Sequence, residues 1–271
     1  MRYLEATARY VPIWRIRRTV RSGPESIDRR GWTGRAAPTV RCMDIILIAG
    51  LWLPRSAWTD VGGELASHGH RPLPVAMPGV DDASTTATLA DQLEAALAAV
   101  DAANRPMVVG HSAACTLAWM IADQRPDAID QVVLVGGFPS SDGAAYADFF
   151  PVVDGVMAFP GWAAFEGADV ADLGEAERER VASGTVAVPE RVAKGIVRLS
   201  DDRRFDVPVL AVCPEYSPDQ AKAWIDAGDV PELSRANQVG LVDIDSGHWP
   251  MVSRPTELAQ ILDAAAQITH G

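Results

Sequence analysis

Long apolar runs are missing from this sequence of 271 residues. The longest ones, such as "IILIAGLWL" at 45–53, have the length of a β-strand and fall well short of the roughly 18 residues that a membrane-spanning helix needs. The remaining composition, 48% hydrophobic and 22% charged, is that of a globular protein with a large buried core. We therefore expect a soluble protein that does not act at a membrane.

Cysteine is scarce, and its number is odd. Two of the three cysteines, Cys115 and Cys213, lie in apolar patterns, and Cys42 has no close partner in the sequence. This distribution favours buried thiols in a reducing compartment over a disulfide framework. We therefore expect a cytoplasmic protein.

Basic charge is scarce after residue 42. Residues 1–42 carry ten arginines against three acidic residues, a net charge of +7, whereas the rest carries 14 basic and 33 acidic residues, a net of −19. An acidic body repels nucleic acid and anionic membranes, so neither is expected as a partner.

The arginine-rich segment 1–42 resembles a targeting peptide, or a twin-arginine signal at "RIRRTVR", but no apolar stretch follows it, and export is disfavoured. We expect this extension to be dispensable, with Met43 as the working start and residues 43–271 as one domain.

Strand-like and helix-like patterns alternate after Met43. Apolar runs without polar alternation predict buried strands, and one-sided apolar patterns predict helices at 88–102 and 255–267. The predicted strands cover 44–49, 71–77, 106–110, 131–136, 207–213 and 239–245. This order predicts an α/β fold with a doubly wound, mostly parallel sheet of about six strands.

One interval interrupts the alternation. About seventy residues separate the fourth and fifth predicted strands, and they contain several phenylalanines and Trp162. Loops of this length without structure are uncommon in compact domains, so we expect an inserted, mainly helical lid at about 138–205.

The stretch "VVGHSAACTLAW" at 108–119 places Ser112 between a predicted strand and a predicted helix. Small residues two positions before and after it, Gly110 and Ala114, permit the tight turn that exposes a nucleophilic serine. Ala114 departs from the more usual glycine by one methyl group. Ser112 is also a favourable helix cap, so the motif alone leaves both interpretations open.

His248 is the candidate general base. It lies just after the carboxyl end of the last predicted strand, and ligands bind at the carboxyl ends of the strands in open α/β sheets. The other histidines are less suitable: His68 and His70 precede the second strand, His111 points away from the serine within the turn, and His270 lies in the tail.

A carboxylate is needed to orient the histidine, and it is expected between serine and histidine in chain order. Glu215, directly after the strand ending in Cys213, is our choice, with Asp219 and Asp142 as alternatives. The backbone N–H groups of Leu51 and Ala113 are the expected oxyanion hole.

Taken together, "LIAGLW", "MPGVDDAS", "VVGHSAA", "VLVGGFPSSD", "VPVLAVCPE" and "IDSGHWP" resemble the α/β-hydrolase family over nearly all of 43–270. Within it, "VLVGGFP" is similar to the branch of methylesterases and hydroxynitrile lyases. Trp249 stands where the lyases carry a lysine, which disfavours lyase activity. The resemblance implies a serine hydrolase that needs no cofactor and no metal.

The leading hypothesis is hydrolysis of a carboxylic ester or lactone of small or medium size, through an acyl-enzyme formed on Ser112. Trp52 and Trp249 are expected to line the apolar substrate pocket, and the protein is expected to be a monomer or homodimer. A carbon–carbon bond hydrolase or an aminopeptidase would share the triad. A non-catalytic small-molecule receptor on the same fold is the alternative outside enzymes.

Overall fold

The computed structural model describes residues 41–165 and 167–268. All of the predicted extension except Arg41 and Cys42, together with His270, therefore lies outside the described residues. No helix within the described ranges is long and apolar enough to cross a membrane.

Six parallel strands form the central sheet, in the order β2-β1-β3-β4-β7-β8. Their bounds are β1 (Asp44–Ile48), β2 (Arg71–Pro74), β3 (Met107–His111), β4 (Gln131–Val135), β7 (Val209–Cys213) and β8 (Val239–Asp243). The predicted fold class is confirmed. The predicted run 71–77 is a strand only up to Pro74, because β2 is an edge strand that contains two prolines, which have no N–H for the ladder.

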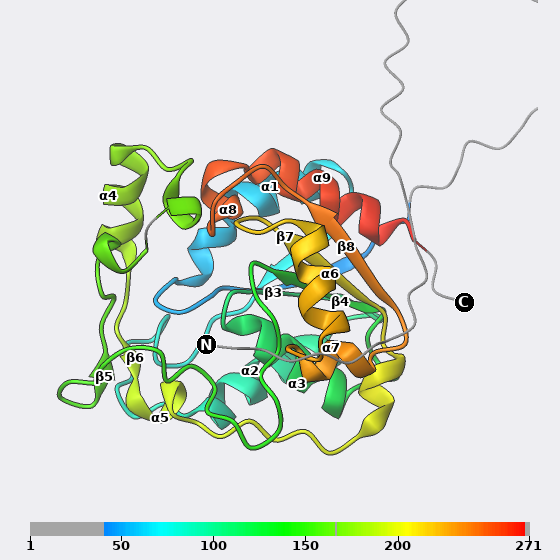
Figure 1. Ribbon diagram of the computed structural model, residues 1–271, viewed down its shortest axis with the longest axis horizontal. Helices are drawn as coiled ribbons and strands as arrows, with labels where there is room; N and C mark the ends of the chain where they lie inside the picture. Colours follow the sequence, from blue (N-terminus) through cyan, green and yellow to red (C-terminus); the bar gives the residue numbers. More distant parts are fainter. Residues whose placement is uncertain (1–40, 166, 269–271) are drawn as a thin grey trace, which may run out of the picture.

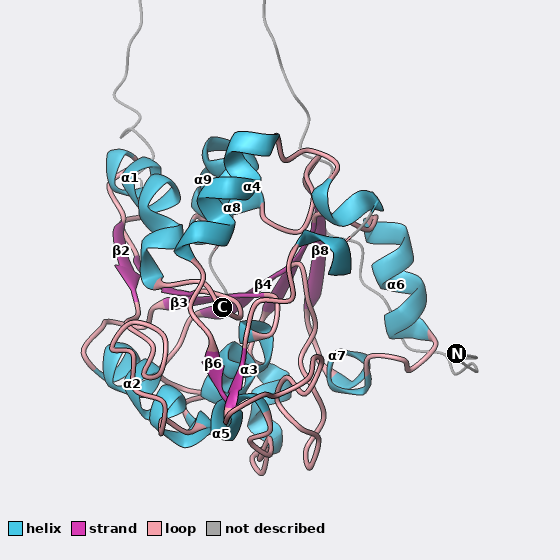
Figure 2. Ribbon diagram, turned by 90° about the vertical axis from the view of Figure 1, so that its left-hand side faces the viewer, coloured by secondary structure: helices cyan, strands magenta, loops and turns pink. Residues whose placement is uncertain are grey.

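Helices cover both faces of the sheet (Figure 2). Those of the main domain are α1 (Thr59–Ser67), α2 (Leu89–Asp101), α3 (Ala114–Gln124), α6 (Pro218–Asp226), α7 (Pro231–Arg235), α8 (Pro250–Ser253) and α9 (Pro255–Ala266), with the 3₁₀ helix η1 (Arg55–Trp58). In Figure 2, α1 and α9 lie above the sheet, and α2 and α3 lie below it.

Alternation along each central strand divides the core into two layers. In β1, Ile46 and Ile48 belong to the layer with α2 and α3, whereas Ile45 and Leu47 belong to the layer with α1 and α9. Successive strand side chains point to opposite faces, so a central strand covered on both faces reads as a continuous apolar run.

The chain between β4 and β7 forms an insertion, which we define as residues 138–205. It contains β5 (Val156–Met157), η2 (Trp162–Ala164), η3 (Gly167–Val170), α4 (Glu175–Gly184), β6 (Val188–Pro189) and α5 (Glu190–Ala193), and η4 (Asp202–Asp206) leads back to the sheet. The insertion is less helical than predicted: its helices are short, the antiparallel pair β5-β6 lies among them, and much of the segment is irregular. Figure 1 shows the insertion, in green to yellow, along the left-hand side and the bottom of the molecule.

Local capping sets where several helices begin. Thr88 caps α2 and Ser217 caps α6, each in a reciprocal box with the residue three positions later. Ser217 accepts the Gln220 N–H at 3.2 Å, and Pro218 occupies the first helical position. The helix therefore begins three residues after Glu215, which keeps this side chain close to the end of β7.

Candidate active site

Ser112 occupies a strained turn between β3 and α3. Its φ of 56° lies in the left-handed region, which a non-glycine residue adopts at a cost of about 1–3 kcal/mol. A Cβ on Gly110 would lie 2.3 Å from the Ala114 carbonyl oxygen, so only glycine fits there. The Ser112 N–H donates to the Val135 carbonyl at 2.8 Å, which ties the turn to β4.

The three predicted side chains lie in one hydrogen-bonded row. His248 Nε2 is 2.9 Å from Ser112 Oγ, and His248 Nδ1 is 2.8 Å from Glu215 Oε1. A carboxylate only accepts, so Nδ1 carries the hydrogen and the Nε2 lone pair faces the serine hydroxyl. The His248 and Glu215 side chains are each 16% exposed, which limits solvent screening of their interaction.

The alternative acids lie elsewhere. Asp142 Oδ1 accepts the Leu199 N–H at 2.9 Å within the insertion, and Asp219 lies in the first turn of α6. The structure thus brings Glu215 to His248 and leaves the other two apart. Glu215 Oε2 is buried, with no hydrogen-bond partner among the described residues.

The predicted oxyanion donors come from two segments near the serine. Ala113 directly precedes α3 and Leu51 follows β1, and neither N–H donates to an acceptor in the described part of the chain. A Cβ on Gly50 would lie 3.0 Å from Ser112 Cβ, so the end of β1 closely approaches the nucleophile. Two unpaired backbone donors in such a place suit a developing oxyanion.

Trp52 and Trp249, the predicted pocket residues, are only 6% and 4% exposed. The Trp52 ring contacts three phenylalanines of the insertion, and its indole N–H donates to the Met157 carbonyl at 3.0 Å. Trp249 packs between His248 and two further rings of the insertion. We call this set the aromatic cluster, and it comprises Trp52, Phe150, Phe159, Trp162, Phe165 and Trp249.

The backbone of His248 has two further anchors, which the sequence did not reveal. Its N–H donates to the Asp169 carbonyl of the insertion at 2.8 Å, and His111 Nε2 lies 2.7 Å from its carbonyl oxygen. Burial, with a further contribution from His248, lowers the pKa of His111 to about 3. Burial also raises the pKa of the Asp169 carboxyl, which feels the charges of both His248 and Glu215.

Gly247, the residue before His248, has no room for a side chain. A Cβ there would lie 2.3 Å from the Asp169 carbonyl oxygen and 2.6 Å from Asp172 Oδ1. Glycine is required because the insertion packs directly on the backbone beside His248. The only available sequence signal was the glycine itself.

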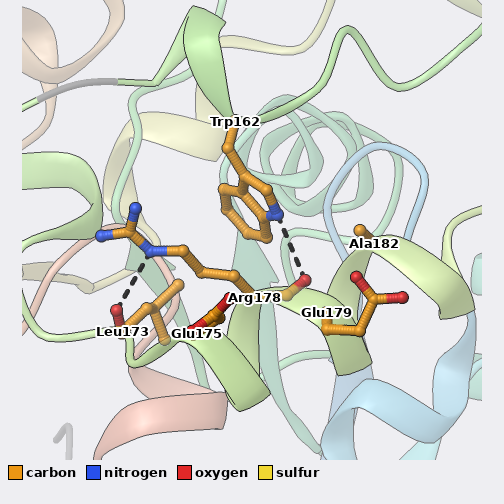
Figure 3. Close-up of a pocket in the computed structure, with 6 residues that line it drawn as sticks. All are labelled: Trp162, Leu173, Glu175, Arg178, Glu179 and Ala182. Carbon is orange, nitrogen blue, oxygen red and sulfur yellow. Dashed lines mark hydrogen bonds between the residues drawn. The ribbon is translucent and has the colours of Figure 1, made fainter.

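An open hollow of about 440 Å³ lies on the insertion and is lined by Trp162, Leu173, Glu175, Arg178, Glu179 and Ala182 (Figure 3). The Arg178 guanidinium is occupied there, because Nε and Nη2 donate to the carbonyls of Leu173 and Val170. None of the three residues of the hydrogen-bonded row lines this hollow. Nor do the described residues include a group of three or more His, Cys, Asp or Glu side chains that could hold a metal ion.

The sequence matches the model of the alpha/beta hydrolase family over residues 45–261. The chain belongs to the α/β-hydrolase family. This match covers the sheet, the serine turn and His248, and it confirms the family that the motifs predicted. A search of curated proteins found no match.

Solved structures share this fold at low sequence identity. An extracellular α/β-hydrolase from a Paenibacillus species is 16% identical with a TM-score of 0.68, over 83% of this chain and all of that one. A methylesterase from Arabidopsis is 13% identical with a TM-score of 0.65, over 82% and 98%. A pyrethroid hydrolase from Sphingobium faniae is 17% identical with a TM-score of 0.62, over 83% and 97%.

Proposed function

We propose that this α/β-hydrolase is a serine hydrolase that cleaves a carboxylic ester or lactone of small or medium size. The observation that carries the proposal is the continuous row from Ser112 Oγ through the His248 imidazole to Glu215. A serine hydroxyl at 2.9 Å from a histidine nitrogen, with the other nitrogen held by a carboxylate, has the arrangement of an activated nucleophile.

The reaction would proceed in two halves. Ser112 Oγ attacks the ester carbonyl carbon while His248 Nε2 takes the proton of the serine hydroxyl. The resulting oxyanion accepts hydrogen bonds from the N–H groups of Leu51 and Ala113. The tetrahedral intermediate collapses, and His248 returns the proton to the leaving alcohol. Water then attacks the acyl-enzyme with the same base, which releases the acid and restores Ser112. Glu215 keeps His248 in the tautomer with its hydrogen on Nδ1 and stabilises the imidazolium that forms transiently.

The aromatic cluster supports an apolar substrate. Trp249 lies against the His248 ring, with ring centroids 4.9 Å apart, and Phe165 contacts both Trp249 and Trp52. Apolar and aromatic walls beside a few polar groups are typical of small-molecule sites. The methylesterase and the pyrethroid hydrolase among the similar folds are consistent with this substrate class.

Active-site labelling separates the hydrolase from a receptor on the same fold. A fluorophosphonate probe should label the wild type and should not label Ser112→Ala, whereas Ser67→Ala, which removes an exposed hydroxyl at the end of α1, should label normally. Folded wild type without Ser112-dependent labelling would contradict the proposal.

A substrate series tests the bond type and the pocket. Turnover of p-nitrophenyl esters should depend on acyl length, and a flat profile would count against an apolar acyl pocket. Turnover of an amino-acid anilide in preference to these esters would favour an aminopeptidase, and preference for a diketone would favour carbon–carbon bond hydrolysis.

A further inference from the structure

His111 lies between the serine turn and the loop that carries His248. His111 is only 1% exposed, and the centroid of its ring is 5.0 Å from the centroid of the His248 ring. Nε2 of His111 is 2.7 Å from the His248 carbonyl oxygen, across 137 positions of the chain. Nothing in the proposed reaction uses this ring directly, yet it contacts the residue whose position the reaction requires.

The tautomer of His111 follows from its partner. A carbonyl oxygen only accepts, so Nε2 must carry the hydrogen, and in a neutral ring Nδ1 keeps the lone pair. Nδ1 is buried without a hydrogen-bond partner in the described structure, and it faces Gly50, where a Cβ would lie 2.7 Å away. The pKa of about 3 keeps the ring neutral near neutral pH. His111 is therefore a constant donor there.

Three hydrogen bonds from different parts of the fold hold His248. The Asp169 carbonyl accepts its N–H, Glu215 accepts its Nδ1–H, and His111 donates to its carbonyl. The first comes from the insertion and the second from the end of β7. The third comes from His111, the neighbour of Ser112 in the chain, and among the described residues it is the one backbone anchor of His248 that comes from the serine turn, beside the direct contact between His248 Nε2 and Ser112 Oγ. Errors of about 1 Å in the alignment of these two atoms can cost about 100-fold in rate.

We propose that His111 is a positioning residue: its Nε2–H fixes the His248 backbone relative to the Ser112 turn and so maintains the contact between His248 Nε2 and Ser112 Oγ. The inference rests on the proposed serine hydrolase function for its kinetic consequence. Its structural part, control of the His248 ring by His111, can be measured without catalysis.

The kinetic test compares His111→Phe, which keeps a ring but has no N–H, with His111→Gln, whose amide can place a donor near Nε2. The readouts are the rate constant for Ser112 phosphonylation and kcat and KM for p-nitrophenyl acetate, below the unfolding range of every variant. We expect His111→Phe to lower both rates by about 10- to 100-fold with KM nearly unchanged, and His111→Gln to regain most of the loss.

His70 supplies the matched control, because it is buried and hydrogen-bonded to Asp263 away from the site. His70→Phe and His70→Gln should leave the phosphonylation rate within about twofold even where they lower stability. Equal rates in folded His111→Phe and wild type would overturn the inference, as would equal losses in the phenylalanine and glutamine variants of His111.

Imidazole NMR of ¹⁵N-histidine protein provides the readout that is independent of activity. The wild type should show His111 protonated at Nε2 alone, and His111→Phe should shift the His248 ring resonances, with partial return in His111→Gln. Unchanged His248 resonances would overturn the inference. If these shifts occur in a protein that lacks Ser112-dependent labelling, positioning stands and the proposed function fails.

Discussion

Replacing His111 by glutamine should remove a pH-dependent part of the free energy of unfolding. The pKa of His111 is about 3 in the folded protein, against 6.5 for an ordinary histidine. Between these values the unfolded chain binds a proton that the folded protein does not bind. The free energy of unfolding therefore falls as the pH falls below 6.5, and this loss is absent above it.

The size of the effect follows from the two pKa values. Each unit of pH within the window changes stability by about 1.4 kcal/mol, so lowering the pH from 7.5 to 5.0 should cost about 2 kcal/mol through His111 alone. With an m-value of about 2 kcal/mol per molar urea, this corresponds to a midpoint shift of about 1 M. His111→Gln keeps a donor for the His248 carbonyl and lacks the titrating group.

The assay is urea unfolding of wild type and His111→Gln at both pH values. Other titrating groups contribute equally to the two proteins, so the difference between their pH-dependent losses isolates His111. Val109→Ala, in the same strand, is the control: it should lose stability at both pH values and keep the wild-type pH dependence. Equal pH-dependent losses in wild type and His111→Gln would refute the reasoning.

Three further predictions test the site and the core. Glu215→Gln should lower kcat for ester hydrolysis by about 10²- to 10⁴-fold, because the imidazolium loses its charged partner, whereas Asp219→Asn and Asp142→Asn should stay near wild type in steady-state assays; a loss in Asp219→Asn instead would reassign the acid. Gly247→Ala should slow fluorophosphonate labelling of Ser112 at least tenfold, because its Cβ would lie 2.3 Å from the Asp169 carbonyl oxygen. The control is Gly63→Ala in α1, where a Cβ would meet nothing within 4 Å; it should raise the free energy of unfolding by about 1 kcal/mol and leave labelling unchanged. Normal labelling in Gly247→Ala would contradict the packing argument. Arg204→Met should lower the free energy of unfolding by about 3–5 kcal/mol, because it strands the buried carboxylates of Asp123 and Glu232, whereas exposed Arg203→Met should cost less than about 1 kcal/mol; similar urea midpoints for the two variants would show that the buried network contributes little.

The fold could be predicted because its signals are local. Strands such as β1 and β3 are buried on both faces and appear as continuous apolar runs, and α2 shows its apolar face at helical spacing. The turn around Ser112 was predictable for the same reason, since Gly110 and the serine are neighbours in sequence. The predicted length of the edge strand β2 was too great. Pro72 and Pro74 fit an apolar strand pattern in the sequence, but they cannot donate hydrogen bonds to a neighbouring strand.

Long-range packing limited what the sequence could say about the site. Glu215, Asp219 and Asp142 all follow strands of the right kind, and no local property separates them. The capped start of α6 leaves Glu215 at the end of β7. Asp142 instead accepts a hydrogen bond from the Leu199 N–H within the insertion. Choosing among carboxylates required distances between segments that are far apart in the chain.

The sequence by itself determined the parallel sheet, the serine turn and the place of His248 at a strand's carboxyl end, because spacing and small residues act over a few positions. Tertiary structure alone decided that Glu215 reaches His248, that His111 and Asp169 hold its backbone, and that Gly247 must lack a side chain. Each of these depends on contacts between segments brought together by the crossovers and the insertion. Such contacts do not alter the spacing of apolar residues along either segment, so they cannot be read from the sequence.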